Sequence, residues 1–158
     1  MNKGFTLIEM IVAVGVFTVA ITLSLASFLN ISAIQKKAEA FRLVNNNLNF
    51  ALEAMVREIK TGSNYSSIDG SSLIITNSSE INITFFLENN QIKRQIEGDD
   101  PLALTTPEVQ ITNLQFIMKP PANPQPMVTV LINGVIEEKG EIKSHLDLQT
   151  TISQRKLE

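Results

Sequence analysis

The 158-residue chain carries 13 basic and 16 acidic side chains, giving a formal net charge of −3 with no block of like charges. This balance gives no support to nucleic-acid binding, because that function requires a surface dense in Lys and Arg. The chain contains no Cys, which excludes disulfides, thiolate metal sites and cysteine nucleophiles. Its length allows one modest globular domain and an accessory segment.

The N-terminal segment has the length and composition of a membrane span. From Met10 to Gln35 the sequence contains no charged residue, and about 20 apolar helical residues are enough to cross a bilayer. Lys3 precedes this run, and Lys36 and Lys37 follow it, so the positive charges alone do not define its orientation. Glu9 lies at the edge of the run, where burying an unpaired carboxylate is costly.

After the span, apolar residues recur at steps of three and four, which is typical of an amphipathic helix. The apolar stripe comprises Phe41, Val44, Leu48, Leu52, Met55, Val56 and Ile59. Asn45, Asn46 and Asn47 fall mostly on the other faces of this helix. No proline interrupts the region, and Gly62 with the polar residues after it is a good stop signal. We therefore predict one helix from about Phe5 to Thr61.

Beyond Tyr65 the apolar residues alternate with polar ones, which is the period of a half-buried strand. The predicted strands cover 72–77, 81–87, 91–97, 109–118, 127–138 and 146–152. Asn89 and Asn90 tolerate positive φ and predict a tight hairpin, and a one-residue slip near Asn113 predicts a bulge. A sheet of five or six antiparallel strands needs a cover for its apolar face, and the helical stripe provides one. The predicted fold class is α+β, with a long N-terminal helix packed on a C-terminal antiparallel β-sheet.

The first residues of the chain carry a specific motif. Gly4 is followed by Phe5, Thr6, Leu7, Ile8 and Glu9, and then by the apolar run. This GFTLIE hexad, a few residues after the initiator methionine, resembles the processing site of type IV pilins and of the pseudopilins of type II secretion systems. The resemblance implies a pilin-like fold and a structural filament subunit that is not an enzyme and needs no cofactor.

In this family a membrane peptidase cuts after the glycine on the cytoplasmic side and methylates the new amino terminus. The resemblance therefore implies cleavage between Gly4 and Phe5 and N-methylation of Phe5. It also implies that Glu9 acts in subunit assembly, where its carboxylate neutralises the free amine of Phe5 in a neighbouring subunit. A buried pair of this kind contributes register more than net stability. The alternative, in which Glu9 reaches the lipid headgroups near the helix end, stays open.

On this resemblance the chain divides into four parts. Residues 1–4 are a prepilin leader, 5–35 a transmembrane or filament-core helix, 36–61 its amphipathic continuation, and 62–158 an extracytoplasmic antiparallel β-sheet domain. The expected location is the cytoplasmic (inner) membrane, single-pass with the N-terminus inside, and a pilus or pseudopilus after assembly. The expected partners are prepilin peptidase, other pilins or pseudopilins through the N-terminal helix, an inner-membrane assembly platform, and membrane lipid before assembly. No nucleic acid is indicated.

Other sequence features concern the kind of subunit. Major pilins and the major pseudopilin usually have a proline in the N-terminal helix, and many major pilins close a C-terminal loop with a disulfide; this chain has neither feature. Both absences favour a minor subunit. The stretches ALEAMVREIKTGSNY, INITFFLENNQIKRQI and LDLQTTISQRK are similar to minor pseudopilins of the J kind. The alternatives are a filament-tip adhesin, a DNA-uptake (competence) minor pilin, and a single-pass membrane protein with an extracytoplasmic sensor domain unrelated to filaments.

Few side chains indicate chemistry. His145 is the single histidine, so the sequence does not favour a catalytic triad or a histidine-rich metal site. Glu97, Gly98, Asp99 and Asp100 offer hard oxygens for calcium, but they lack the alternating spacing of a calcium-binding loop, and a solvated turn is the favoured interpretation. We predict no catalytic residue and no metal site.

Overall fold

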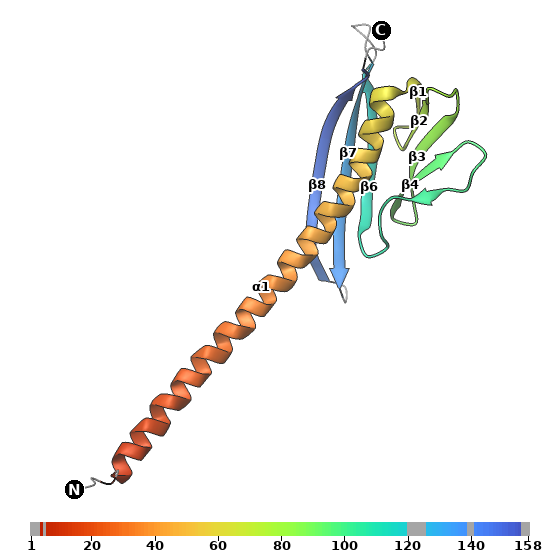
Figure 1. Ribbon diagram of the computed structural model, residues 1–158. Helices are drawn as coiled ribbons and strands as arrows, with labels where there is room; N and C mark the ends of the chain where they lie inside the picture. The colour runs from red at the N-terminus through yellow and green to blue at the C-terminus, as the bar shows by residue number, and fades with distance from the viewer. Residues whose placement is uncertain (1–3, 5, 120–125, 139–140, 156–158) are drawn as a thin grey trace. The chain divides into compact units, whose positions relative to one another are not determined.

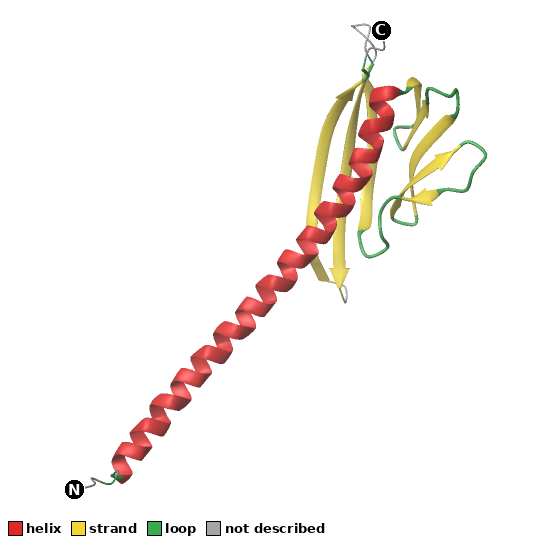
Figure 2. Ribbon diagram, in the orientation of Figure 1, coloured by secondary structure: helices red, strands yellow, loops and turns green. Residues whose placement is uncertain are grey.

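The structure is a computed structural model that describes residues 4, 6–119, 126–138 and 141–155. Within these ranges one helix, α1 (Leu7–Thr61), is followed by eight strands (Figures 1 and 2). The strands are β1 (Ser63–Ile68), β2 (Ser72–Thr76), β3 (Asn82–Glu88), β4 (Gln91–Ile96), β5 (Leu102–Ala103), β6 (Gln110–Lys119), β7 (Met127–Glu138) and β8 (Glu141–Ser153). The predicted α+β class, in which a long apolar N-terminal helix precedes antiparallel strands, is confirmed.

The chain forms two compact units, Met1–Ala38 and Glu39–Glu158, and α1 contributes to both. In the first unit the large apolar side chains of α1 are exposed, from 43 % for Ile21 to 79 % for Leu7. This part of α1 is long and apolar enough to cross a membrane. An apolar surface of this extent is unstable in water, so it requires lipid or other helices around it.

Four hydroxyl groups in the first unit are satisfied within α1 itself. The side chains of Thr18, Thr22, Ser24 and Ser27 each donate a hydrogen bond of 2.8 to 3.0 Å to the carbonyl oxygen four residues earlier. A hydroxyl that is bonded in this way imposes little penalty in hydrocarbon, because no polar group is left without a partner. These four hydroxyl groups are therefore compatible with a lipid environment.

The second unit contains two antiparallel sheets, one with the strand order β1-β2-β3-β4-β5 and one with the order β6-β7-β8. Asn89 and Asn90 join β3 to β4 with φ values of 52° and 59°, so the predicted hairpin is confirmed. The register of β6 against β7 shifts between Ile111 and Asn113, which confirms the predicted bulge.

The prediction of a single sheet of five or six strands is wrong. β1 and β5 were not predicted, and β8 begins at Glu141 instead of Leu146. β1 escapes detection because its sequence, SNYSSI, has no apolar alternation. The division into two sheets was not predicted, because alternation shows only which face of a strand is buried. Whether β6 joins the first sheet after β5 or begins a second sheet depends on tertiary packing.

The core lies between the second half of α1 and the inner faces of both sheets (Figure 1). The helix contributes the fully buried Val44, Leu48, Ala51, Met55 and Ile59. The sheets contribute Leu73, Ile75, Ile83, Phe85, Ile92, Ile111, Leu114, Phe116, Val128, Val130, Ile132 and Ile152, and the loop before β6 contributes Val109. Close approach is visible at Gly134 of β7, where a Cβ atom would lie 3.1 Å from Leu48 Cδ2. Burial of this cluster is the main source of stability for the second unit.

Two helical residues differ from their predicted environments. Phe41 is predicted in the buried stripe, but it is 47 % exposed. The first buried residue of α1 is Val44, so Phe41 precedes the part of the helix that packs on the sheets. Asn47 was expected on a polar face, but it is buried at 8 % exposure. Its Oδ1 accepts a hydrogen bond from the Thr106 N–H (2.8 Å), and its Nδ2 donates to the Leu43 carbonyl (3.0 Å). Asn47 therefore lies on the buried face because a loop supplies its polar partner.

The C-terminal end of α1 is closed by residues that are far away in the sequence. Gly62 N–H donates to the Glu58 carbonyl, and a Cβ atom at Gly62 would lie 2.2 Å from Ile75 Cγ2, so only glycine fits there. The Arg155 N–H donates to the Lys60 carbonyl (3.0 Å). The predicted helix stop is thus confirmed, and the N–H group of Arg155, two residues after β8, pairs with one of the free carbonyl oxygens at the helix end.

Candidate functional site

The start of α1 is organised by a reciprocal pair of hydrogen bonds. The Thr6 side-chain oxygen accepts from the Glu9 N–H (3.3 Å), and the Glu9 carboxylate accepts from the Thr6 N–H (3.5 Å). The Met10 N–H donates to the Thr6 carbonyl, so Thr6 is the N-cap residue of the helix. This is a capping box, which satisfies two amide groups that a helix start otherwise leaves without partners.

The Glu9 carboxylate keeps most of its bonding capacity. It is the only charged side chain from Leu7 to Gln35, and it is exposed within the first unit. Among the residues the structure describes, no cation forms a salt bridge with it. An ionised carboxylate has about four acceptor positions, and the Thr6 amide uses one of them. Glu9 can therefore accept a cationic group from outside the chain without breaking the capping box.

Gly4 lies ahead of the helix in an open position. It is exposed, it belongs to no helix or strand, and no atom lies within 4 Å of a Cβ built on it. A glycine in such a segment lets another protein approach the backbone closely. Phe5 and the leader residues Met1–Lys3 lie outside the described residues, so the predicted cleavage and methylation of Phe5 remain sequence-based predictions.

Thr6 caps the helix of this site, a role that was not predicted from the sequence. The signal for it was present, because a Thr followed three residues later by Glu just before an apolar run is the sequence pattern of a capping box. The structure brings Thr6 and Glu9 together, which shows that Glu9 also stabilises the start of its own helix.

Residues 1–25 match the family described as "Prokaryotic N-terminal methylation motif". The chain begins with a type IV pilin-like prepilin signal. Neither the comparison with curated proteins nor the comparison with solved structures gives a match. A prepilin signal of this kind implies processing by prepilin peptidase and assembly with other pilins. Together with the apolar first half of α1, it fits a pilin-like protein anchored in the inner membrane.

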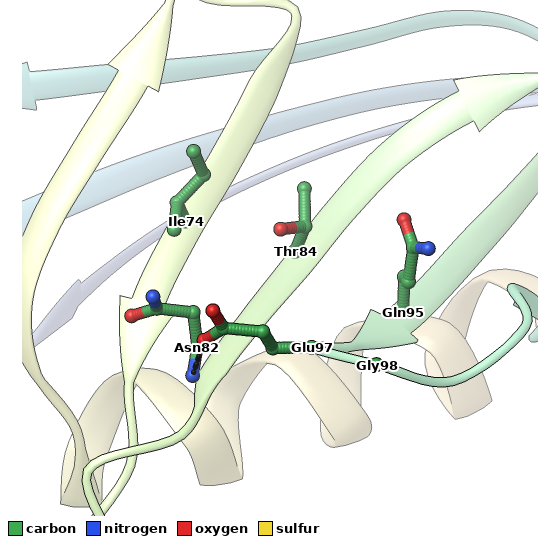
Figure 3. A pocket seen from close by; sticks show the side chains of 6 residues that line it. All are labelled: Ile74, Asn82, Thr84, Gln95, Glu97 and Gly98. Carbon is green, nitrogen blue, oxygen red and sulfur yellow. Dashed lines mark hydrogen bonds between the residues drawn. The ribbon is translucent and has the colours of Figure 1, made fainter.

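The other candidate residues from the sequence belong to the second unit. His145 is exposed on β8, and Glu97 to Asp100 form the turn after β4, with Gly98 at a φ of 92° (Figure 3). Across the described ranges, no three His, Asp or Glu side chains gather in a way that could hold a metal ion. The two described ion pairs, Glu58–Arg94 and Glu88–Lys93, lie within the second unit.

Proposed function

We propose that this protein is a minor pilin or pseudopilin, a structural subunit of a type II secretion pseudopilus or of a type IV pilus. The observation that carries this proposal is the prepilin signal at residues 1–25, directly ahead of a helix whose apolar side chains are exposed. A helix of this kind is stable in lipid before assembly and against other apolar helices after it. The protein is structural, and its N-terminal helix contributes to the filament core.

Maturation removes the leader Met1–Gly4 by cleavage between Gly4 and Phe5, and the new amino terminus at Phe5 is methylated. The open position of Gly4 supports this assignment, since a peptidase must bind the backbone in extended form on both sides of the bond that it cuts. Cleavage on the cytoplasmic side places the N-terminus inside and the two sheets outside the membrane.

Assembly pairs the Glu9 carboxylate with the Phe5 amine of a neighbouring subunit. The unused acceptor positions of Glu9 support this pairing, and an ion pair in an apolar environment is a strong determinant of register. Small residues along the first half of α1 let neighbouring helices approach closely; these are Ala13, Gly15, Ala20, Ser24 and Ala26.

The subunit type is a minor one, most similar to the J kind, with a position at the tip or in the initiation of the filament. The absence of proline in α1 and the absence of cysteine support this assignment over a major subunit. Partners on this proposal are prepilin peptidase, other pilins or pseudopilins and the inner-membrane assembly platform.

The proposal is tested by the mass of the N-terminal peptide of the protein isolated from cells that contain prepilin peptidase. We expect a peptide that begins at N-methylated Phe5. We expect Gly4→Val to retain residues 1–4, because a branched side chain blocks close approach to the backbone, whereas Gly15→Ala should mature normally. Sheared filaments that contain this chain with Met1 still attached would contradict the proposal.

A further inference from the structure

We propose that the Thr6 hydroxyl positions the peptide bond between Gly4 and Phe5 for cleavage, because it ends α1 before the helix includes that bond. The inference rests on the proposed function, in which prepilin peptidase removes residues 1–4. Thr6 is a positioning residue, since it acts through the backbone conformation and not on the reacting atoms. It adds to this reaction a determinant that lies outside the cleaved bond.

A peptide bond within a stable helix is a poor substrate for a peptidase. Its carbonyl oxygen is occupied by a hydrogen bond, and a helical backbone does not fit a site that binds an extended segment. Such a bond is cut only in the fraction of molecules in which the helix is locally open. The residue at which α1 begins therefore controls how much of the chain presents the bond after Gly4 in a form that can be cut.

The sequence upstream of Thr6 contains little that stops a helix. No proline occurs before Pro101, and Asn2 is a favourable N-cap residue for a longer helix. In an apolar environment a helix tends to extend, since each additional turn pairs amide groups that otherwise lack partners. Gly4 opposes helix formation, but a single glycine is tolerated inside a helix, as Gly15 of α1 shows. The helix therefore needs a specific signal to begin after Gly4.

The backbone amide of Thr6 is used in a way that excludes the longer helix. In a helix that continued upstream, the Thr6 N–H would donate to the carbonyl oxygen of Asn2, four residues earlier. In the structure the same N–H donates to the Glu9 carboxylate at 3.5 Å. The two bonds are alternatives for one donor. The capping box thus competes directly with the helical turn that would contain the cleaved bond.

The Thr6 hydroxyl makes the second competing bond. Its oxygen accepts from the Glu9 N–H at 3.3 Å, and α1 begins at Leu7. Without the hydroxyl, the regular helical acceptor for the Glu9 N–H is the carbonyl oxygen of Phe5, the residue after the cut. With the hydroxyl, Gly4 is exposed and belongs to no helix or strand. The cap therefore keeps the helix from extending toward the bond after Gly4.

Substitution of Thr6 in the full-length chain tests the inference. The unprocessed chain is purified in detergent from cells without prepilin peptidase, and cleavage is started by adding membranes that contain the enzyme. Thr6→Val keeps the branched shape and nearly the same helix propensity, but it removes the hydroxyl. We expect an initial cleavage rate about three- to thirtyfold lower, which is the range that loss of a cap produces.

Two further variants separate capping from other effects. Thr6→Ser keeps a hydroxyl at the cap and should be cleaved at a rate within about twofold of the natural one. Thr18→Val makes the same change inside α1, where the hydroxyl bonds only the Val14 carbonyl, and should also stay within about twofold. The mass of the N-terminal peptide identifies the cleaved bond, and gel mobility gives the rate.

The conformation of Gly4 gives a readout that a general loss of stability would not change. Carbon-13 labelling of glycine reports the carbonyl chemical shift of Gly4, and Gly15 inside α1 is the helical reference in the same spectrum. We expect a non-helical shift for Gly4 in the natural chain and in Thr6→Ser. In Thr6→Val the shift should move toward that of Gly15, because the helix then extends upstream.

Three results would overturn the inference. The first is a Thr6→Val rate within about twofold of the natural rate. The second is an equal loss of rate in Thr6→Val and in either control, and the third is slow cleavage of Thr6→Val while Gly4 stays non-helical. Each leaves the proposed function intact when the natural chain is cleaved after Gly4. A natural chain that the peptidase does not cleave there refutes the proposed function, and the inference with it.

Discussion

Glu9 combines two roles that use different properties of its side chain. Within its own chain, it accepts a hydrogen bond from Thr6 and completes the capping box at the start of α1. In the proposed filament it supplies a negative charge for the Phe5 amine of a neighbour. The capping role needs only an acceptor oxygen, because Gln serves as well as Glu at this position of a capping box. The assembly role needs the charge.

These roles predict different outcomes for Glu9→Gln and Thr6→Ala. Glu9→Gln keeps the acceptor and removes the charge, so we expect normal cleavage after Gly4 but strongly reduced incorporation into sheared filaments. Thr6→Ala removes the cap, at a cost of about 0.5 to 2 kcal/mol of helix stability, and keeps the charge. Immunoblots of membrane and filament fractions measure both steps. Incorporation of Glu9→Gln at the natural level would contradict the pairing with Phe5.

Asn47 is the polar residue whose burial only the structure revealed. Its side chain bonds the Thr106 N–H at 2.8 Å and the Leu43 carbonyl at 3.0 Å. We expect Asn47→Ala to lower the free energy of unfolding by about 1 to 3 kcal/mol, because it leaves the Thr106 amide without its partner. Asn46→Ala is the matched control on the exposed face and should change it by less than about 0.5 kcal/mol. Urea unfolding of the detergent-solubilised chain compares them.

At the scale of elements, an ion pair joins α1 to the five-stranded sheet. Arg94 of β4 donates to the Glu58 carboxylate of α1 at 2.8 Å, and both side chains are mostly buried. A second pair, between Glu88 and Lys93, lies within the β3–β4 hairpin, and its carboxylate is about half exposed. Both pairs join a glutamate to a cation, but they differ in burial and in their separation along the chain. Comparing them therefore shows how burial changes the contribution of an ion pair to stability.

We expect Glu58→Ala to lower the free energy of unfolding by about 1.5 to 3 kcal/mol, because Arg94 then loses a charge-assisted bond in a mostly buried position. Glu88→Ala should cost less than about 1 kcal/mol, since water replaces its partner at an exposed site. Thermal unfolding followed by circular dichroism measures both. Equal losses for the two variants would show that the Glu58–Arg94 pair adds nothing beyond a surface contact.

At the scale of the whole molecule, Tyr65 makes the free energy of unfolding depend on pH in the alkaline range. Its hydroxyl lies 2.7 Å from the carbonyl oxygens of both Ile59 and Gly62 at the end of α1. Burial raises the pKa of Tyr65 from 10.0 to about 12. The folded protein therefore holds the phenol proton more tightly than the unfolded chain does. The stabilisation is fully present below about pH 10 and is lost as the pH rises from about 10 to about 12.

This dependence can be measured on one group, because Tyr65 is the only tyrosine and the chain has no tryptophan. We expect the tyrosinate absorbance to titrate near pH 12 in the folded protein and near pH 10 in urea. Tyr65→Phe should unfold more easily at neutral pH and should lose the part of the alkaline destabilisation that belongs to the phenol. A folded-state titration near pH 10 would refute the assignment.

The sequence by itself determined the elements whose signals are local. The hexad from Gly4 to Glu9 predicted the prepilin signal, the uncharged run predicted an exposed apolar helix, and the Asn89–Asn90 turn and the slip at Asn113 predicted a hairpin and a bulge. Each of these depends on the intrinsic preferences of neighbouring residues, on hydrophobic period or on a short motif, which a sequence displays directly.

Only the tertiary structure decided features that depend on residues far apart in the chain. The division into two sheets, the burial of Asn47 by the Thr106 loop and the closure of α1 by the Arg155 amide all join segments that local period cannot connect. Alternation shows which side of an element is exposed, but the shape and charge of a surface emerge only when separate elements pack side by side.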